Sequence, residues 1–329
     1  MSTSGKLHLA AHMINYVVAL PLMILGIVGV ILSMIVFTLH ASFRRNTTIN
    51  YLMAGSVLAG IHLLIVDIQT MLVGGFDFGV YNTNEAVCRE HTYIRYVTTV
   101  STICFPCWAA FDQYVGTSRD ANFRNRWRSM RFVRLAIICT VIFWILTYIP
   151  IIFTSEIIDG TCQLRQSPYK LFNTYVLTPL VHIIIPALVM LYYTRGTIQN
   201  LRSAIVQSSH EHLAKQVRRM LIPQLFLLVV SGVPFGLEGI YYYLTSNVQR
   251  DANQIALENL VSQIIMLFYH FNFIFTFYIY VSLSSEVRKA LRKTVLQGLR
   301  KLQLCSRHVK VGNLMLRHSH HTLAPPIET

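Results

Sequence analysis

The chain has 329 residues, of which 53% are hydrophobic and only 13% are charged. Because soluble domains carry about 25% charged residues, this composition predicts a membrane protein. The formal net charge is +14, but the basic residues cluster between long apolar runs, which argues against a nucleic-acid-binding protein.

Seven apolar runs of about 21 to 28 residues each predict seven membrane-spanning helices, because about 20 apolar residues cross a bilayer. The sequence therefore predicts an all-α membrane protein built as a seven-helix bundle. The loops between the runs are too short to hold a second domain. The runs lie near residues 14–39, 49–73, 89–113, 133–154, 172–194, 218–245 and 257–281.

We expect four segments along the chain. Residues 1–13 form a short N-terminal segment, and residues 14–283 form the seven-helix domain. Residues 284–305 form a short amphipathic eighth helix, because apolar residues recur every four positions beside basic ones. Residues 306–329 form a disordered tail. Cys305, at the end of the eighth helix, is a candidate for palmitoylation, with a free thiol as the alternative.

The positions of lysine and arginine predict the orientation of the chain in the membrane. With the N-terminus outside, most of the 28 basic residues fall in the inner segments. The outer loops carry acidic residues instead. We therefore expect an extracellular N-terminus, a cytoplasmic C-terminus and a basic inner rim that contacts anionic lipid headgroups. The rim comprises Arg119, Arg124, Arg126, Arg128, Arg202, Arg218 and Arg219.

The third run begins at Cys88 and ends at Asp112-Gln113-Tyr114. A helix between these points rises about 37 Å at roughly 1.5 Å per residue, which is enough to cross the hydrocarbon core and reach the headgroups. The cysteine and the polar triplet are thus predicted to lie on opposite sides of the bilayer. Cys104 and Cys107 lie inside this apolar helix, where packing is favoured over redox or metal chemistry.

This third helix resembles that of rhodopsin-like (class A) G protein-coupled receptors, in which a cysteine opens the helix outside and Glu/Asp-Arg-Tyr closes it inside. Asn50-Tyr51-Leu52 fits the family's second-helix run. The resemblance extends from Ile14 to about Cys305, and its strength lies in the order and spacing of the matches. Further matches are Trp144 in the fourth helix, Cys162 in the second outer loop, Pro186 in the fifth, Pro234 in the sixth and Tyr280 in the seventh.

The resemblance implies a plasma-membrane receptor that transduces an extracellular ligand into signalling by a heterotrimeric G protein. It also implies a disulfide between Cys88 and Cys162. The residues that it assigns to the switch are Asp112, Gln113, Tyr114, Pro234 and Tyr280.

Several departures from the family pattern fall on its switching parts. His62 stands where the family has an aspartate that helps to hold a sodium ion, and a neutral imidazole does not supply the anionic ligand that sodium prefers. We expect His62 to be hydrogen-bonded in the interior, with proton sensing as the alternative. Gln113 replaces the family's arginine, and Gly232 replaces an aromatic switch residue. The alternative function is therefore a receptor-like protein with altered or lost G protein coupling.

Three charged residues, Asp67, Arg95 and Glu238, are predicted in the outer halves of helices. Charges at such depth are usually paired or functional. One interpretation pairs Arg95 with Asp67 or Glu238. The other has Arg95 bind a ligand carboxylate and Glu238 a ligand amine, so that the ligand is a peptide or a small anionic or zwitterionic molecule. The other candidate ligand contacts are Tyr96, Thr99, His182, Tyr242, Tyr269 and His270.

Other classes of function fit less well. The amine receptors of the resembled family carry an aspartate at the position of Arg95, which disfavours a monoamine ligand. An opsin is excluded because His270 stands about where its retinal-binding lysine would be, and a Schiff base needs an amine. A transporter predicts broken helices or inverted halves, which the runs do not show. The sequence shows no acid/base or metal motif, so we expect no enzyme, no metal site and no cofactor.

Overall fold

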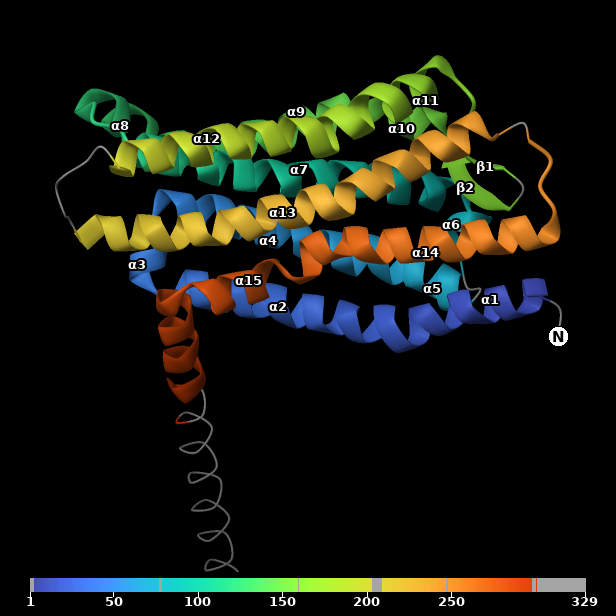
Figure 1. Cartoon of the computed structure of the whole chain (residues 1–329), viewed down its shortest axis with the longest axis horizontal. Coiled ribbons are helices and arrows are strands. Elements are labelled where there is room, and N and C mark those ends of the chain that lie inside the picture. The colour runs from blue at the N-terminus through green and yellow to red at the C-terminus, as the bar shows by residue number, and fades with distance from the viewer. Residues whose placement is uncertain are drawn as a thin grey trace, which may run out of the picture. The chain divides into compact units, whose positions relative to one another are not determined.

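The computed structural model describes residues 3–76, 79–158, 160–202, 209–246, 248–297 and 300, without the side chains of residues 74–76, 202 and 209–220. Long helices make up most of the described chain (Figure 1). The chain divides into two units, Met1–Ser284 and Ser285–Thr329. The first unit contains all of the predicted spans.

The first span consists of α1 (Thr3–Ile14), a π-helical turn η1 (Asn15–Ala19) and α2 (Leu20–Leu39). This helix begins well before the apolar run that starts at residue 14. The extension packs against the seventh span, and the hydroxyl of Ser4 lies 3.4 Å from the carbonyl oxygen of Ala252. A tertiary contact thus accounts for helix in a segment that is too polar to predict it.

The second span follows the short helix α3 (Ala41–Arg44) and consists of α4 (Thr47–Ile61), η2 (His62–Asp67) and α5 (Ile68–Phe76). Asn46 caps α4, because its side chain accepts a hydrogen bond from the backbone N–H of Ile49. The π-helical turn η2 changes which side chains share a face of the helix. Hydrogen bonds that join residues five apart widen the helix there, which brings His62 and Asp67 onto the same face.

The third span is α7 (Glu85–Thr117), a helix of 33 residues. It follows the short helix α6 (Val80–Thr83) and is capped by Asn84, whose side chain accepts from Ala86 and Val87. The connection to the fourth span holds α8 (Ala121–Trp127), which is capped by Asp120. These caps satisfy helix-end N–H groups that would otherwise have no intrahelical partner.

The fourth span, α9 (Met130–Thr147) with α10 (Ile149–Thr154), leads into a two-stranded antiparallel hairpin. Strand β1 (Ser155–Ile158) pairs with β2 (Thr161–Leu164), with Ser155 opposite Leu164 and Ile157 opposite Cys162. Gly160 in the turn has φ of 72°, a conformation that glycine adopts without steric cost.

The remaining spans complete the bundle. The fifth comprises α11 (Pro168–Phe172), η3 (Asn173–Leu177), η4 (Leu180–Ile184) and α12 (Ile185–Arg202). The sixth is α13 (Ser209–Leu244). The seventh is bent by 51° between α14 (Ala252–Ile274) and α15 (Thr276–Leu283).

Among the residues that the structure describes, five helices are long and apolar enough to cross a membrane by themselves, and the bent pair α14 and α15 makes a sixth. The remaining span is α7, the third in chain order, which lies among the other helices (Figure 1) and buries polar residues such as Thr98, Ser101 and Gln113. The predicted all-α seven-helix membrane bundle is therefore confirmed.

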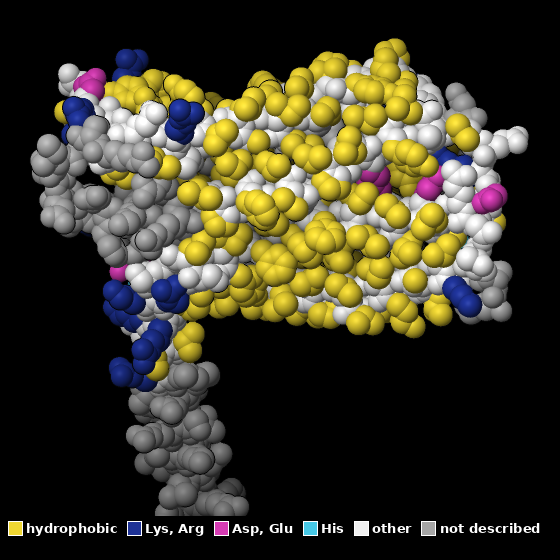
Figure 2. Space-filling view, viewed as in Figure 1, with side chains coloured by type: hydrophobic (Ala, Val, Ile, Leu, Met, Phe, Trp, Pro, Cys, Tyr) yellow, Lys and Arg dark blue, Asp and Glu magenta, His cyan; other side chains and the backbone are white. Residues whose placement is uncertain are grey.

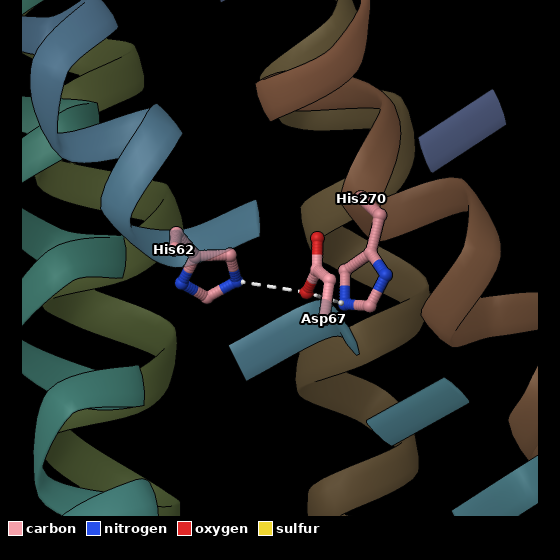
Figure 3. Close-up of side chains that lie close together, drawn as sticks. All are labelled: His62, Asp67 and His270. Atoms are coloured by element: carbon pink, nitrogen blue, oxygen red, sulfur yellow. Dashed lines mark ion pairs between the residues drawn. The ribbon is translucent and has the colours of Figure 1, made fainter. Parts of the chain in front are cut away.

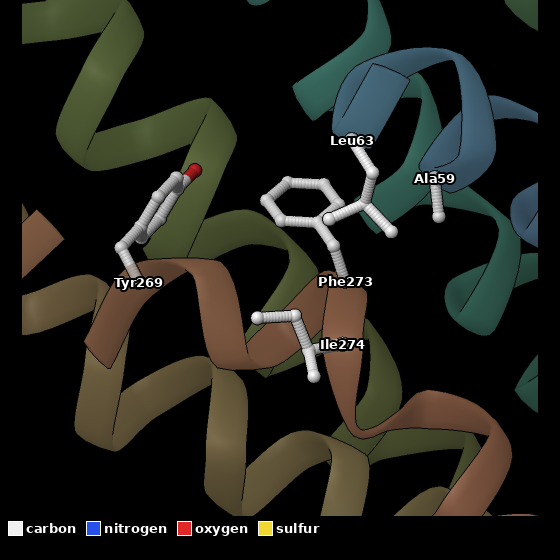
Figure 4. Packing of buried hydrophobic residues seen from close by; sticks show 5 residues of the cluster. All are labelled: Ala59, Leu63, Tyr269, Phe273 and Ile274. Carbon is white, nitrogen blue, oxygen red and sulfur yellow. The ribbon is translucent and has the colours of Figure 1, made fainter. Parts of the chain in front are cut away.

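Apolar side chains cover both the inside and the outside of the bundle. Inside, Ala59 and Leu63 of the second span pack against Tyr269, Phe273 and Ile274 of α14 (Figure 4). Outside, hydrophobic side chains spread over the long face of the helices (Figure 2), and α9 exposes Leu135, Ile138, Ile142, Phe143 and Leu146. A surface of this kind is stable against lipid rather than water.

The second unit contains a helix over residues 285–297, where Arg288, Lys289, Arg292 and Lys293 are exposed. This agrees with a basic amphipathic eighth helix over that range. Cys305 and the tail 306–329 lie outside the described residues, so palmitoylation and disorder stay predictions.

Candidate ligand site and switch residues

A disulfide joins Cys88 at the start of α7 to Cys162 in the hairpin, with 5.6 Å between the two Cα atoms. The backbone N–H of Cys162 also donates to the side-chain oxygen of Asn82 at 2.9 Å. These contacts hold the hairpin against the end of α7. The predicted pairing of the two cysteines is confirmed.

Arg95 is half-buried in α7 and has no acidic side chain within ion-pair distance among the described residues. Its closest polar contact is the sulfur of Met266, 3.7 Å from Nη2. Its charge nevertheless acts on Asp67 and Glu238. The structure thus contradicts a direct ion pair of Arg95 with either acid, and within the described part of the chain the guanidinium has no acidic partner.

Several predicted ligand contacts form a chain of hydrogen bonds beside Arg95. The hydroxyl of Tyr148 lies 3.1 Å from Nε2 of His182, and the hydroxyl of Tyr269 lies 3.4 Å from Nδ1 of the same ring. Tyr96 packs on Tyr148, with 5.3 Å between ring centroids. His182 and Tyr269 are buried, so they shape the site and bond to each other. Sequence reasoning missed Tyr148, which no spacing motif marks.

Three predicted contacts lie apart from this chain. The hydroxyl of Tyr242 donates to the carbonyl oxygen of Glu258 at 3.3 Å, and the guanidinium of Arg250 lies over its ring. Glu238 is half-buried and bonds to Ser262. Thr99 is buried in α7. The structure therefore does not gather all eight predicted ligand contacts around one point.

His270 joins a different group, formed with His62 and Asp67 (Figure 3). Oδ1 of Asp67 lies 3.3 Å from Nε2 of His62 and 3.3 Å from Nε2 of His270. Nδ1 of His62 lies 2.9 Å from the hydroxyl of Thr98, so the predicted hydrogen-bonded interior histidine is confirmed. We call these three residues the His62–Asp67–His270 cluster.

At the other end of α7, Asp112 is buried in a polar network. It accepts hydrogen bonds from the hydroxyls of Thr47, at 2.8 Å, and Thr48. Nε of Arg128 lies 3.5 Å from its Oδ1. Gln113 donates to the hydroxyl of Thr48 at 2.6 Å. Asp112 thus has a cationic neighbour, Arg128, which follows α8 in the sequence and which sequence reasoning had placed only in the basic rim.

The other switch candidates lie at helix contacts. Tyr280 accepts a hydrogen bond from Gln224 of α13 at 2.9 Å. The ring of Tyr114 lies against Gly196, where a Cβ atom would approach it to 2.8 Å. Pro234 lies within α13. The side chains of Arg202, Arg218 and Arg219 are outside the description, so their place in the basic rim stays a prediction.

A cavity of about 50 Å³ lies between α2, α4, α7, α13 and the seventh span. Its lining includes Ser33, Thr102 and Gln224, and each has a buried polar atom without a hydrogen-bond partner among the described residues. Its lining includes none of the predicted ligand contacts. The cavity has room for a water molecule, and Ser33, Thr102 and Gln224 could bind it by hydrogen bonds.

A family model described as 7 transmembrane receptor (rhodopsin family) matches residues 29–280, which is most of the chain. The chain belongs to this family. No curated protein matches the sequence of this receptor. Members of the family are receptors rather than enzymes, and they work with extracellular ligands and G proteins in general.

Two features of the receptor could not be found by matching motifs. The π-helical turn that brings Asp67 beside His62 contains no glycine or proline, so the sequence does not indicate it. Arg128 reaches Asp112 from a segment that looked like a solvated loop. One signal in the sequence could have indicated Arg128. Asp112 lacks the neighbouring arginine of the family, because that position is Gln113, and a buried acid needs a cation nearby.

Proposed function

We propose that the receptor lies in the plasma membrane with its N-terminus outside and binds an extracellular ligand that carries an anionic group. The ligand class is a peptide or a small anionic or zwitterionic molecule. Ligand binding would then drive a heterotrimeric G protein at the Asp112 end of the bundle. The observation that supports this most directly is Arg95, a half-buried guanidinium without an ion pair among the described residues.

The energetic reason is the cost of an unpaired charge at membrane depth. Such charges are rare and usually mark a ligand or ion pathway. A carboxylate or phosphate on the ligand would give Arg95 a charge-assisted, bidentate partner. Tyr96 and the Tyr148–His182–Tyr269 chain would hold the wall beside it. Glu238, which Arg95 influences but does not contact, would be available for a cationic group of a zwitterionic ligand.

A ligand screen on the starting receptor and three variants tests this proposal. The readout is arrestin recruitment or a conformational sensor, which needs no particular G protein. For anionic hits, Arg95→Ala should raise the half-maximal concentration at least tenfold, and Arg95→Lys should recover only part of it because the bidentate geometry is lost. Leu257→Ala, which removes an exposed side chain on α14, serves as the control. Hits that remain equally potent on Arg95→Ala would contradict the proposal.

The second candidate is a receptor-like protein with altered or lost G protein coupling. Gln113 favours it, because this residue bonds to Thr48 and cannot form a bidentate charged pair. The same screen separates the two candidates. Ligand-dependent arrestin recruitment without activation of any G protein class would support the second candidate and contradict coupling.

A further inference from the structure

We propose that the His62–Asp67–His270 cluster is a binding site for a divalent transition-metal ion, with Zn²⁺ as the best fit. The cluster contains two imidazole nitrogens and one carboxylate oxygen, all within 4.8 Å of one another. His62 and Asp67 come from η2, and His270 comes from α14 (Figure 3). A bound ion would therefore connect the second span to the seventh.

The distances fit zinc coordination. Both Nε2 atoms lie 3.3 Å from Oδ1 of Asp67. Ligand atoms bonded to zinc at about 2.0–2.2 Å in a tetrahedron lie roughly 3.3–3.5 Å apart. The third pair, formed by one nitrogen of each imidazole, lies within 4.8 Å, so binding would require these two nitrogens to lie within the same range. Two imidazoles and one carboxylate leave the fourth position open to water or to a donor on a ligand.

Asp67 provides an independent reason to expect a cation. Its side chain is buried, and neither carboxylate oxygen has a hydrogen-bond partner among the described residues. Both neighbouring Nε2 atoms lie 3.3 Å from Oδ1 as ion-pair contacts, which count as charged pairs only if an imidazole is protonated. A buried carboxylate without hydrogen bonds is costly, and metal coordination is one of the few ways to offset that cost.

Thr98 favours the tautomer of His62 that a metal requires. The Thr98 hydroxyl lies 2.7 Å from the carbonyl oxygen of Ile94, which can only accept a hydrogen bond. When the hydroxyl donates there, it accepts from Nδ1–H of His62 at 2.9 Å. The Nε2 lone pair of a neutral His62 then faces the cluster. Phe273 stacks on the imidazole with 4.1 Å between ring centroids and restrains its orientation. Such support of a ligating histidine is typical of metal sites.

The donor set selects among metals. Sodium, magnesium and calcium prefer oxygen ligands, whereas imidazole suits zinc, copper and nickel. The charge of Arg95 acts on both Asp67 and His270 and opposes a second cation nearby. The site should therefore bind zinc more weakly than the same site would without the positive charge of Arg95. Removing the Arg95 charge should strengthen zinc binding several-fold.

The test uses the purified full-length receptor, freed of metal by a chelator and reconstituted in nanodiscs. Zinc binding is measured by competition with a fluorescent zinc indicator, and Co²⁺ is used as a spectroscopic probe of tetrahedral coordination. We expect Asp67→Asn and His270→Gln to lose one zinc equivalent, and Arg95→Gln to bind zinc more tightly. His270→Cys should keep the site, because a thiolate is also a zinc ligand.

The matched control is His91→Gln. His91 is a buried histidine on α7 that stacks on Tyr81 and lies outside the cluster. It should keep the full zinc equivalent. Histidines of the C-terminal tail are present in every variant, so their binding cancels in the comparison. Equal zinc binding by the starting receptor, Asp67→Asn and His270→Gln would overturn the proposal. So would the absence of tetrahedral Co²⁺ absorption from a folded receptor, which would point to a protonated imidazole instead.

Discussion

At the residue scale, nearby side chains replace the interaction that is lost where the third helix departs from the family pattern. The arginine that usually follows the acid at the end of the third helix is Gln113. Arg128 supplies a cation to Asp112 from another segment, and Thr47 and Thr48 supply hydroxyls. The acid is therefore held to the second span by hydrogen bonds and to the α8 segment by charge. This contact is the candidate resting lock of the receptor.

We predict that Gln113→Arg changes basal or ligand-driven G protein output while surface expression stays close to that of the starting receptor. An arginine at this position would compete with Arg128 for Asp112 and would lose the present bond to Thr48. Second-messenger assays in a cell line where the receptor couples measure the effect. An unchanged basal and maximal output in such cells would remove Gln113 from the switch.

At the element scale, glycines allow close helix contacts at the same end of the bundle. Gly116 on α7 lies under the guanidinium of Arg128, where a Cβ atom would approach Nη1 to 2.7 Å and Cζ to 3.0 Å. Gly196 on α12 accommodates the ring of Tyr114 in the same way. The absence of side chains at these positions lets α7 contact both the α8 segment and α12.

The variant Gly116→Ala should raise basal activity about two-fold or more, because its methyl group would push Arg128 away from Asp112. The matched control is Gly239→Ala on α13, where a Cβ atom would meet nothing within 4 Å. Alanine in a helix is favoured over glycine by about 0.5–1 kcal/mol. The control should therefore gain thermal stability without a change in signalling. Equal basal activity in the two variants would argue against the lock.

At the scale of the whole molecule, the disulfide links the hairpin to α7 across a long stretch of sequence. The Cys88–Cys162 bond joins two residues that lie 74 positions apart in the sequence. In the chain-entropy model, closing the loop between them is worth about 4 kcal/mol, and confinement in the membrane reduces that figure. The hairpin and α7 consequently depend on each other for their position.

Replacing Cys162 with serine should lower the thermal stability of the purified receptor and weaken any ligand response, since the hairpin loses its attachment to α7. Differential scanning fluorimetry in detergent measures the stability. Mass spectrometry of the unaltered receptor from the cell surface should find the two thiols joined in one cross-linked peptide. Recovery of both as free thiols would contradict the bond.

Orientation can be checked directly in intact cells. We expect an epitope inserted next to Asp120 to be inaccessible to antibody until the membrane is permeabilised, and an N-terminal epitope to be accessible without permeabilisation. The reason is the positive-inside bias of Arg124, Arg126 and Arg131. Staining of the epitope next to Asp120 in intact cells would contradict the predicted topology. It would also contradict the proposed assignment of the ligand end and the G protein end of the bundle.

The sequence by itself determined the class of fold and the order of its parts. Run length and hydropathy specify helices in lipid, because every backbone polar group there must be satisfied within the segment. The spacing from Cys88 to Asp112 placed the two ends of α7, and the family resemblance then supplied the partner of Cys88.

Only the tertiary structure decided which polar side chains meet. The π-helical turn rotates Asp67 toward His62, and α14 brings His270 to the same point, although this residue lies far away in the sequence. Arg128 reached Asp112 in the same way, and Arg95 was left without the acid that seemed available to it. Pairings of this kind depend on helix rotation and loop geometry. Hydropathy and spacing do not encode these, because several pairings satisfy the same pattern of apolar runs.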